Sequence, residues 1–466
     1  MIEQLQSLMK ALEAGSYNAA PGDLRQGASL MVEDLSPVMH NVTFDDSHIK
    51  LQKVLPSKDV KSQLHQFNRQ LDYGIFGGSA QFEGGIGEED TSNYVRAVVP
   101  MAYYSTTRRV TVAANMIGAF DGVKAEDRAA ADAAMKLSGD IEFDCFRGQS
   151  DFSNAGVFDG NPLAVAKVPN MIGLDQQVRQ SDGQQNTQDL MFAEYGSDQT
   201  VILSAGGTLT QSLIEDSSVR SAMNMGAADR LILDPISLSA YNKIAHAKER
   251  IMLAGSAQEA TGAHLRTQWT SSAVVSLEAS RFLSGKTRPA RARSTNPLAA
   301  PAIVVADPGA AGSLLQTGTY TYYVTSVNMR GESLPSAASA QAVTAGDKVT
   351  VTITPAAGAQ YYNIYRSDVN ASAASAKFIG RIAQAAGSPV FTDLGNRQPG
   401  SVTGFLIQAN TMGLAQLAPY SKLKLAIHDL SLPEAHFRFL SLAAYQPRKN
   451  VILENITGQL SPIQGI

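Results

Sequence analysis

One stretch constrains the fold more than any other: a glycine-rich, acidic run over residues 73–90, followed by two strand-like segments and one long helix. Glycine at this density gives the backbone freedom and prevents a stable isolated structure. The next segments, 94–99 and 109–112, are rich in β-branched and aromatic residues, which favour strands. An amphipathic helix is predicted over about residues 123–146. A flexible arm joined to a ribbon and a rigid helix suits a subunit that reaches over its neighbours better than it suits an active site.

The charges of this stretch separate into an acidic tip and a basic root. The acidic residues are Glu83, Glu88, Glu89 and Asp90, and the basic residues on the ribbon are Arg96, Arg108 and Arg109. Because an extended strand advances about 3.3 Å per residue, the root cannot easily reach its own tip. We therefore expect these residues to form contacts between copies of the chain. The alternative is a solvated hairpin, in which each exposed pair contributes only about 0–1 kcal/mol.

The predicted long helix carries an apolar stripe whose positions step by four, three, four and four. The stripe consists of Ala130, Ala134, Leu137, Ile141 and Cys145. Charged residues lie off the stripe, so one face of the helix is expected to pack against the subunit's own sheet. The alanines would let that sheet approach closely.

Residues 200–250 alternate between strand and helix. Two short apolar runs, 201–203 and 230–233, predict buried strands. Ser212 and Glu215 have the spacing of a capping box that opens a helix. Asp234-Pro235 supplies an N-cap and a proline at the first helical position of the next helix. The pattern predicts a compact α/β unit, whose sheet Trp269 and residues 274–277 are expected to continue.

The composition changes at Lys286 and again at Gly400. Between 301 and 400 there is little charge, and apolar residues recur with a period of two. The strands expected there are 319–328, 348–353, 361–366, 378–382 and 390–392. Short strands at this spacing predict a β-sandwich. Later strands near 405–407, 436–440 and 451–453 are expected to complete the earlier sheet, which would make the sandwich an insertion.

Composition excludes several classes of protein. A length of 466 residues suggests about three domains, and 44% hydrophobic residues can bury a sizeable core. The net charge of −4 lacks the basic field of a dedicated nucleic-acid binder. A single cysteine, Cys145, excludes an intrachain disulfide and a cysteine-based zinc site, and fits a reducing cytosol. The N-terminus has no signal-peptide pattern, and no run of about 18 apolar residues predicts a membrane span.

Motifs for catalysis and cofactors are incomplete. Residues 284–287 read Ser-Gly-Lys-Thr, but Ser280 stands where a phosphate loop needs glycine. Residues 85–87 begin a dinucleotide motif whose third glycine is replaced by Asp90. The seven histidines include no pair at helical metal-ligand spacing, and His428-Asp429 are only sequence neighbours. We therefore expect no enzymatic activity, no metal and no cofactor.

Two further groups of residues, the basic linker residues and the sandwich tyrosines, are expected to bind no ligand. The basic linker residues Arg288, Arg291 and Arg293 lack aromatic neighbours that could stack on bases, so a solvated hinge is expected. The tyrosines of the sandwich could line a sugar-binding face, but burial in the core is the expectation for them.

The order of these elements resembles that of a tailed-bacteriophage major capsid protein, a shell fold shared with herpesvirus capsid floors and encapsulins. The likeness covers residues 1–297 and 404–466. Residues 79–84, 100–104 and 109–111 look like the extended loop of that family, and Arg230-Leu-Ile-Leu-Asp-Pro235 with Leu238 and Tyr241 looks like its axial domain.

Residues 301–400 resemble an immunoglobulin- or fibronectin-type-III-like domain. Tyr320-Thr-Tyr-Tyr-Val-Thr-Ser-Val-Asn328, Gly331-Glu-Ser333 and Tyr362-Asn-Ile-Tyr-Arg366 carry that likeness. The two main motifs stand in the reverse of their usual order in a fibronectin module.

The resemblance implies an α+β phage capsid fold with an inserted all-β sandwich. The implied parts are an N-terminal arm (1–70), an extended β loop (71–115), a spine helix with the peripheral domain (116–200), an axial α/β domain (201–297), the inserted immunoglobulin-like sandwich (298–403) and a C-terminal return that completes the capsid domain (404–466).

The resemblance also implies a function. The chain would form hexamers and pentamers of an icosahedral shell that encloses the double-stranded DNA of a tailed bacteriophage, without sequence-specific DNA binding and without a membrane. It implies assembly in the host cytoplasm with a scaffolding protein and a portal, decoration proteins as further partners, and a final place in the virion, with the sandwich on the outer surface.

Two alternatives remain at the level of sequence. An encapsulin-like bacterial compartment would share the shell fold and enclose an enzyme. An immunoglobulin-domain adhesin or carbohydrate-binding protein would explain the sandwich, but it leaves the other three quarters of the chain and the missing export signal unexplained.

Overall fold

The computed structural model describes residues 45–74, 79–87, 89–117, 123–148, 171–181, 201–248, 266–283, 298–328, 331–359, 361–384, 387–427 and 429–457. Sheets predominate over helices in these residues, and the fold class is α+β, as predicted. Most of the expected N-terminal arm (1–70) and the basic linker around 286–293 lie outside the described residues. None of the described helices has the length and apolar character of a membrane span.

One layer of the molecule is a four-stranded sheet, called the long sheet below, with the strand order β1-β18-β19-β4. Its strands are β1 (Ser57–Asp59), β18 (Met412–Lys424), β19 (Ser431–Ala444) and β4 (Ala102–Thr111). β1 runs parallel to β18, and the other pairs are antiparallel. Burial alternates along β4, as expected for a strand with one face on a core.

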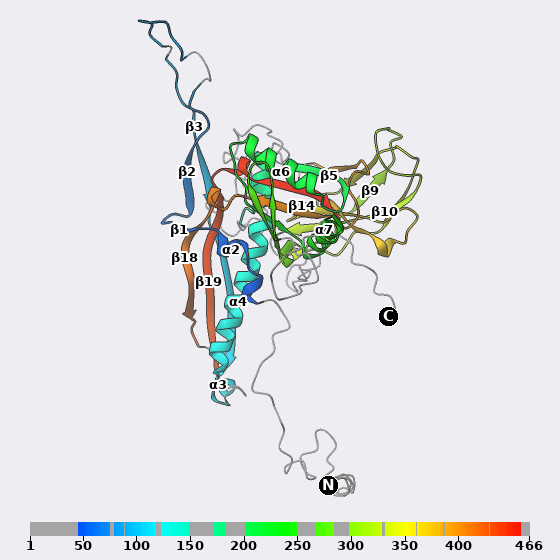
Figure 1. The fold of residues 1–466 in the computed structure, drawn as a ribbon. Coiled ribbons are helices and arrows are strands. Elements are labelled where there is room, and N and C mark those ends of the chain that lie inside the picture. Colours follow the sequence, from blue (N-terminus) through cyan, green and yellow to red (C-terminus); the bar gives the residue numbers. More distant parts are fainter. Residues whose placement is uncertain are drawn as a thin grey trace, which may run out of the picture.

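The long helix α4 (Ala125–Arg147) lies along the long sheet (Figure 1). The fully buried residues Ala133, Leu137, Ile141 and Cys145 follow one another in steps of four. Ala130 and Ala134, which the sequence placed on the buried stripe, are only half-buried. Steps of four form the ridge along which helices commonly pack, so the true buried face is rotated by one residue in the first half of the helix.

A two-stranded hairpin projects beyond the long sheet. It consists of β2 (Leu64–Gln70) and β3 (Tyr94–Pro100), which pair from Leu64↔Pro100 to Gln70↔Tyr94. β3 continues almost directly into β4, so the hairpin and the long sheet share one extended segment of chain. Figure 1 shows the loop between β2 and β3 reaching well away from the rest of the molecule.

A six-stranded sheet lies beside this layer, with the order β5-β20-β17-β6-β8-β7. Its strands are β5 (Val201–Gly207), β20 (Val451–Ile456), β17 (Val402–Ile407), β6 (Arg230–Leu233), β8 (Val274–Ala279) and β7 (Thr267–Trp269). Strands from both sides of residue 300 therefore share one sheet.

Two helices pack against the six-stranded sheet. α7 (Pro235–Lys248) begins as predicted, and Asp234 Oδ2 accepts a hydrogen bond from Ile236 N at 3.0 Å. α6 (Gln211–Met223) is capped by Thr210, whose hydroxyl accepts from Leu213 N. The capping box expected at Ser212 is therefore wrong: the helix begins earlier, and Glu215 accepts from Ser271 N instead.

The other described helices are short. They are η2 (Asp46–His48), α2 (Leu51–Val54), α3 (Val112–Ile117), α5 (Leu174–Ser181), η4 (Arg281–Leu283), η5 (Ala373–Ser375), η6 (Ala409–Thr411) and η7 (Pro447–Lys449).

Residues 303–393 form two sheets packed face to face, called the sandwich below. One sheet has the order β16-β13-β9, from β9 (Ile303–Ala306), β13 (Val349–Ile353) and β16 (Val390–Asp393). The other contains β10 (Gly318–Asn328), β11 (Gly331–Glu332), β12 (Ser339–Val343), β14 (Tyr361–Arg366) and β15 (Lys377–Ala383). Its likeness to an immunoglobulin domain stays a prediction.

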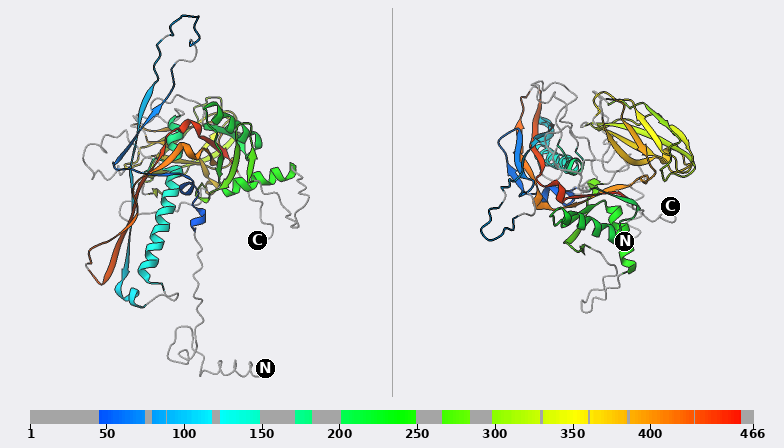
Figure 2. Two further views of the ribbon diagram at one scale, coloured as in Figure 1. Left: turned by 60° about the vertical axis from the view of Figure 1, so that its left-hand side comes forward. Right: turned by 90° about the horizontal axis from the view of Figure 1, so that it is seen from above.

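The described residues contain three apolar cores. The first lies between the long sheet, α4 and α5 and also includes Ile232, Phe405 and Ile452 of the six-stranded sheet. The second lies between the six-stranded sheet and helices α6 and α7. The third belongs to the sandwich alone and contains Tyr320, Tyr322 and Tyr362, which confirms the expected burial of these three tyrosines. Tyr323 and Tyr365, for which core burial was also expected, are only half-buried. Figure 2 shows the sandwich standing apart from the other layers, which are called the body below.

Candidate assembly surfaces

The loop between β2 and β3, residues 71–93, is called the projecting loop. Its base is closed by Asp72, which accepts hydrogen bonds from Asn93 N at 3.1 Å and Asn93 Nδ2 at 2.7 Å. These bonds hold the pKa of Asp72 below its usual value, with the bond from the Asn93 side chain as the largest cause. Gly74 has φ +105°, a backbone conformation that residues with a side chain rarely adopt, and it lies beside Asp90 where the two limbs meet.

The described tip of the projecting loop carries large apolar side chains that its own chain leaves uncovered. Phe82 and Ile86 are 94% and 93% exposed, and Tyr73 further down is 84% exposed. A turn at the tip is closed by Gly85 N, which donates to Phe82 O at 2.8 Å. Apolar side chains this exposed gain free energy when a partner surface covers them.

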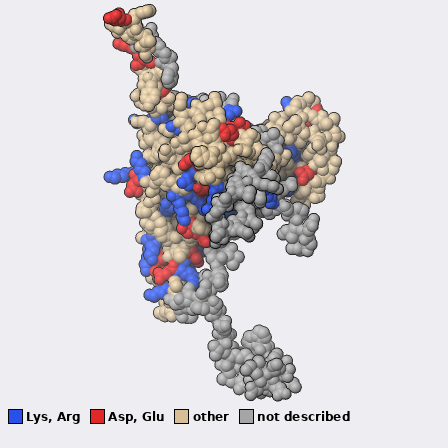
Figure 3. Space-filling view, in the orientation of Figure 1, with Lys and Arg blue, Asp and Glu red and all other residues tan. Residues whose placement is uncertain are grey.

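The predicted acidic residues are spread along the projecting loop instead of gathering at its tip. Glu83 lies in the tip turn, Glu89 is exposed, and Asp90 lies near the base beside Gly74. Glu88 lies outside the described residues. Figure 3 shows acidic atoms at the end of the loop. The expectation of one compact acidic tip is wrong, because a hairpin of this length separates residues 83 and 90 along its limb.

Only one of the three predicted arginines lies at the root of this hairpin. Arg96 is exposed on β3, and its Nε donates to Asn68 Oδ1 at 3.3 Å. Arg108 and Arg109 lie on β4, opposite Glu434 and Pro433 of β19. Over about 14 extended residues, Arg108 stands roughly 45 Å beyond the start of β3. The sequence placed all three on one ribbon because it could not show that β3 pairs with β2 and that β4 pairs with β19.

Arg108 and Arg109 instead belong to the opposite end of the long sheet, which is called the distal end. It comprises α3, the end of β4, and the turn between β18 and β19. Its exposed apolar side chains are Met116, Leu423, Leu425, Ile427 and Leu430. Arg109 Nη1 lies 3.3 Å from Asp429 Oδ2, and both side chains remain more than half exposed.

A second charged group at the distal end ties the sheet to the start of α4. Lys424 Nζ lies 3.0 Å from Glu126 Oε1. This hydrogen bond raises the pKa of Lys424 and lowers that of Glu126. Figure 3 shows basic and acidic atoms mixed at this end of the molecule. The distal end therefore combines uncovered apolar side chains with charges of both signs.

Between the two ends, buried polar contacts make the scaffold rigid. Glu142, fully buried on α4, accepts from the backbone N–H groups of Lys50, Leu51 and Gln52 at 2.7–3.1 Å and so caps the N-terminus of α2. Burial raises the pKa of Glu142, and these hydrogen bonds oppose the rise. Sequence reasoning missed this contact, although a glutamate beside the apolar stripe of a helix was a usable signal.

Gln177 of α5 makes a similar buried bridge to the long sheet. Its side chain accepts from Ala444 N at 2.8 Å and donates to Leu442 O at 2.9 Å, as a neighbouring strand would. Tyr104 OH of β4 donates to Asp144 Oδ2 of α4 at 2.9 Å, and burial raises the pKa of this tyrosine well above its usual value. These buried bonds fasten α2, α4 and α5 to one another and to the long sheet, which lies between the projecting loop and the distal end.

The described residues hold neither a candidate metal centre nor a reactive thiol. They contain no group of three or more histidine, cysteine, aspartate or glutamate residues placed to hold a metal ion. Cys145 is buried, and desolvation raises the pKa of its thiol well above the usual value, which disfavours the reactive thiolate. The phosphate-loop-like residues 284–287 and His428 lie outside the described part.

No family model and no curated protein matches the sequence. Among solved structures, the chain is similar to a chain of the capsid of the native GTA particle, with 9% identity, a TM-score of 0.48, and coverage of 94% of this chain and all of that one. It is similar to a chain of the capsid of Myoviridae phage XM1, with 9% identity, a TM-score of 0.42 and the same coverage. It is also similar to the holo-SrpI encapsulin of Synechococcus elongatus PCC 7942, with 8% identity, a TM-score of 0.41, and coverage of 96% and 100%.

Proposed function

We propose that this chain is a structural shell protein, the major capsid protein that self-assembles into the icosahedral head of a tailed bacteriophage. The observation that carries the proposal is the pair of uncovered apolar surfaces at opposite ends of one rigid element: the projecting loop and the distal end. One copy cannot bring its own two ends together. Contacts between unlike surfaces of successive copies repeat head to tail, and they generate rings when the rotation closes.

The contacts proposed for the projecting loop combine apolar burial with charge. Phe82 and Ile86 would be covered by a neighbouring copy, and Glu83, Glu88, Glu89 and Asp90 would face basic residues of that copy. Arg96, Arg108 and Arg109 are the proposed basic contacts. Each exposed pair contributes only about 0–1 kcal/mol, but a shell repeats it many times. The exposure of Arg96 and Arg109 supports this role.

The contents and location of the shell are further parts of the proposal. A net charge of −4 suits a container for double-stranded DNA, because many phosphate contacts would bind the duplex tightly to the inner wall. Assembly in the host cytoplasm with a scaffolding protein, a portal and decoration proteins, and a place in the virion, belong to the same proposal.

The sandwich is proposed as an immunoglobulin-like module on the outer surface, inserted into the chain. Its separate core and its position apart from the other layers support this. A deletion tests it: residues 303–393 are replaced by a short Gly/Ser linker, and soluble particles are still expected. Loss of particles while the intact chain assembles would contradict the proposal of a dispensable module.

Electron microscopy of the purified full chain tests the proposed function itself. Closed shells of uniform size are expected, at concentrations where a variant lacking residues 79–87 stays unassembled. A monodisperse monomer at every concentration would contradict the shell role and would return the adhesin or carbohydrate-binding alternative to consideration. Shells purified from infected cells should hold double-stranded DNA, whereas a packaged enzyme in them would identify an encapsulin-like compartment instead.

A further inference from the structure

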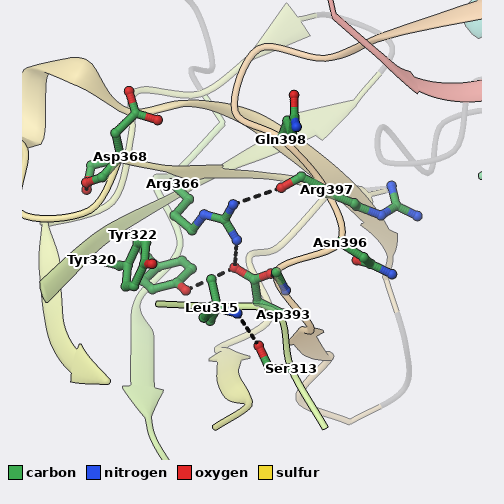
Figure 4. A network of polar contacts seen from close by, with 12 residues as sticks. Ser313, Leu315, Tyr320, Tyr322, Arg366, Asp368, Asp393, Asn396, Arg397 and Gln398 are labelled. Carbon is green, nitrogen blue, oxygen red and sulfur yellow. Dashed lines mark hydrogen bonds and ion pairs between the residues drawn. The ribbon is translucent and has the colours of Figure 1, made fainter. Parts of the chain in front are cut away.

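The segment that leaves the sandwich, Leu394–Gly400, is called the junction. It connects β16 of the sandwich to β17 of the six-stranded sheet. A linker between independent units is usually exposed and makes few contacts. This one is bonded on two sides, and the close-up in Figure 4 shows the side of the sandwich, where Arg366 bonds to the backbone of Arg397.

On the side of the sandwich, the junction is joined to a buried ion pair. Asp393 Oδ2 accepts from Arg366 Nη1 at 2.5 Å and from Tyr322 OH at 3.0 Å. The side chains of Arg366 and Asp393 are only 6% and 1% exposed. Arg366 Nη2 then donates to the backbone oxygen of Arg397 at 2.8 Å, so the same guanidinium holds the ion pair and the junction. Burial, followed by the charge of Asp393, raises the pKa of Tyr322, which keeps its hydroxyl protonated as a donor.

On the opposite side, the junction is bonded to β20 of the body. Asn455 Oδ1 accepts from Gln398 N at 2.7 Å, and Asn455 Nδ2 donates to Asn396 O at 2.6 Å. Arg397 Nη2 lies 3.1 Å from Glu454 Oε2, and the Glu454 side chain is 8% exposed. The amide of Asn455 thus bonds residues 396 and 398 as a peptide group of a neighbouring strand would.

The backbone at Asn455 is shaped for this contact. The pairing of β20 with β17 and with β5 shifts register around this residue. Asn455 itself has φ +64°, a left-handed conformation that asparagine tolerates better than most residues. Bulges re-aim a side chain out of the regular alternation of a strand. The cost of this local irregularity is offset by the two hydrogen bonds of the Asn455 side chain, both of them partly buried.

We propose that the junction and Asn455 form a rigid clamp that holds the sandwich in one fixed orientation on the six-stranded sheet. The sandwich and the body then move as one unit, although their apolar cores are separate. The clamp acts within one chain, so it goes beyond the proposed function and holds whether or not the chain assembles. It also explains why the deletion described above must retain Leu394–Gly400, because these residues bond to Glu454 and Asn455 of β20.

The orientation can be measured in the full chain by double electron–electron resonance. Spin labels are placed at Ala342→Cys in the sandwich and Asp216→Cys on α6, two exposed positions, while Cys145 is buried. Labelled chain is diluted with excess unlabelled chain, so that only distances within one chain contribute. The test variant is Asn455→Gly, which keeps the left-handed backbone accessible and removes both side-chain bonds. The matched control is Asn370→Gly, because Asn370 also has positive φ (+53°) and accepts from Thr319 N inside the sandwich.

A narrow distance distribution is expected for the parent and for Asn370→Gly. Asn455→Gly should broaden the distribution about twofold or more, because relative motion is the default for domains without a fixing interface. An equally narrow distribution in Asn455→Gly would overturn the clamp, and so would a broad distribution in the parent.

A second variant covers the case in which Asn455→Gly does not fold. Arg397→Ala removes a partly exposed side chain and leaves the junction backbone unchanged. Hydrogen exchange of the Gln398 amide, which is protected by Asn455, should be about tenfold faster in this variant if the contacts act together. Unchanged exchange and an unchanged distance distribution would contradict the proposal.

Discussion

The projecting loop and the sandwich both extend away from the body, but they are held in shape by different means. The sandwich encloses its own apolar core and a buried ion pair, Arg366–Asp393. The described part of the projecting loop has no core: Phe82 and Ile86 are almost fully exposed, and the described hydrogen bonds that close the loop lie at its base and at one turn. Figure 1 shows the two regions pointing away from the body in different directions.

This difference indicates which contacts stabilise each region. A unit with two packed sheets is stabilised within one chain, so its shape should be the same in a free and an assembled subunit. A long glycine-rich hairpin without a core gains free energy only when another surface covers its apolar side chains. Substitutions in the sandwich should therefore change the unfolding of the single chain, whereas substitutions in the projecting loop should change association.

The largest effect is expected for Asp393→Ala in the sandwich. This change leaves the Arg366 guanidinium buried without its carboxylate, and removing one partner of a buried pair costs about 3–5 kcal/mol. Unfolding by denaturant, monitored through hydrogen exchange of the amides of β10 and β14, should show this loss of stability in the sandwich. The matched change Asp90→Ala in the projecting loop should leave unfolding of the single chain unchanged. Equal free energies of unfolding for the two variants would contradict the expectation that the sandwich is stabilised within one chain and the projecting loop is not.

An intermediate effect is expected in the body at Glu142. Glu142→Ala removes the acceptor of three buried backbone N–H groups at the start of α2, and leaving such donors unsatisfied costs about 1–3 kcal/mol. Asp132→Ala, at an exposed position of the same helix, should change stability by less than about 0.5 kcal/mol. Thermal or denaturant unfolding measures both variants.

The raised pKa of Glu142 predicts that the stability of the folded chain depends on pH. Its pKa is raised in the folded chain, so the folded state binds this proton more tightly than the unfolded state does. Between the ordinary glutamate pKa of about 4.3 and the raised value, its contribution to stability should therefore fall as the pH rises. Glu142→Gln should remove this slope. An unchanged slope would show that other carboxylates cause it.

A smaller effect on the single chain, but a large one on association, is expected for Phe82→Ser combined with Ile86→Ser. Unfolding of the single chain should change by less than about 0.5 kcal/mol because both side chains are already exposed. If a neighbour buries them, each contributes about 1.5–3 kcal/mol, and every 1.4 kcal/mol shifts the concentration needed for assembly tenfold. Leu334→Ser, at an 80% exposed position after β11, is the control. Light scattering, measured against protein concentration, compares the parent, the double variant and the control. Equal assembly of all three proteins would contradict the prediction.

The smallest effect is expected for Glu83→Lys combined with Glu89→Lys. Both residues are exposed, so the folded chain should be unaffected. Assembly should weaken by about 0–1 kcal/mol per lost contact, and its dependence on salt should change because exposed charges are screened. The charge-neutral pair Glu83→Gln and Glu89→Gln should lie between the parent and the lysine variant. Identical salt dependence in all three would show that these acids are merely solvated.

Local patterns in the sequence were enough to predict many elements. The run 230–233 is β6, and Asp234-Pro235 opens α7 as expected. The long helix was placed within two residues of α4. The alternating tyrosines of 319–328 form β10 and point two of their rings into a core. These elements depend on side-chain periodicity and on capping within a few residues, which a single chain displays directly.

The sequence did not predict which strands pair when they lie far apart in the chain. β18 lies between the expected strands 405–407 and 436–440 and was not itself among the expected strands, yet it pairs with β1 from far upstream and with β19. Arg108 and Arg109 were assigned to the root of the projecting loop, because two adjacent strand-like runs look like a hairpin. In the structure each run has another partner, and the two runs follow each other in one line. The clamp at Asn455 gave no local signal, since its partners lie 57 and 59 residues away.

The sequence by itself determined the fold class, the long helix and a separate strand-rich region after residue 300, because composition and periodicity are local properties. Only the tertiary structure decided which strands are neighbours, which end of the long sheet holds the arginines, and how the sandwich is fastened to the body. The physical reason is that a strand offers the same backbone donors and acceptors to any partner, so its choice depends on the packing of side chains from distant segments.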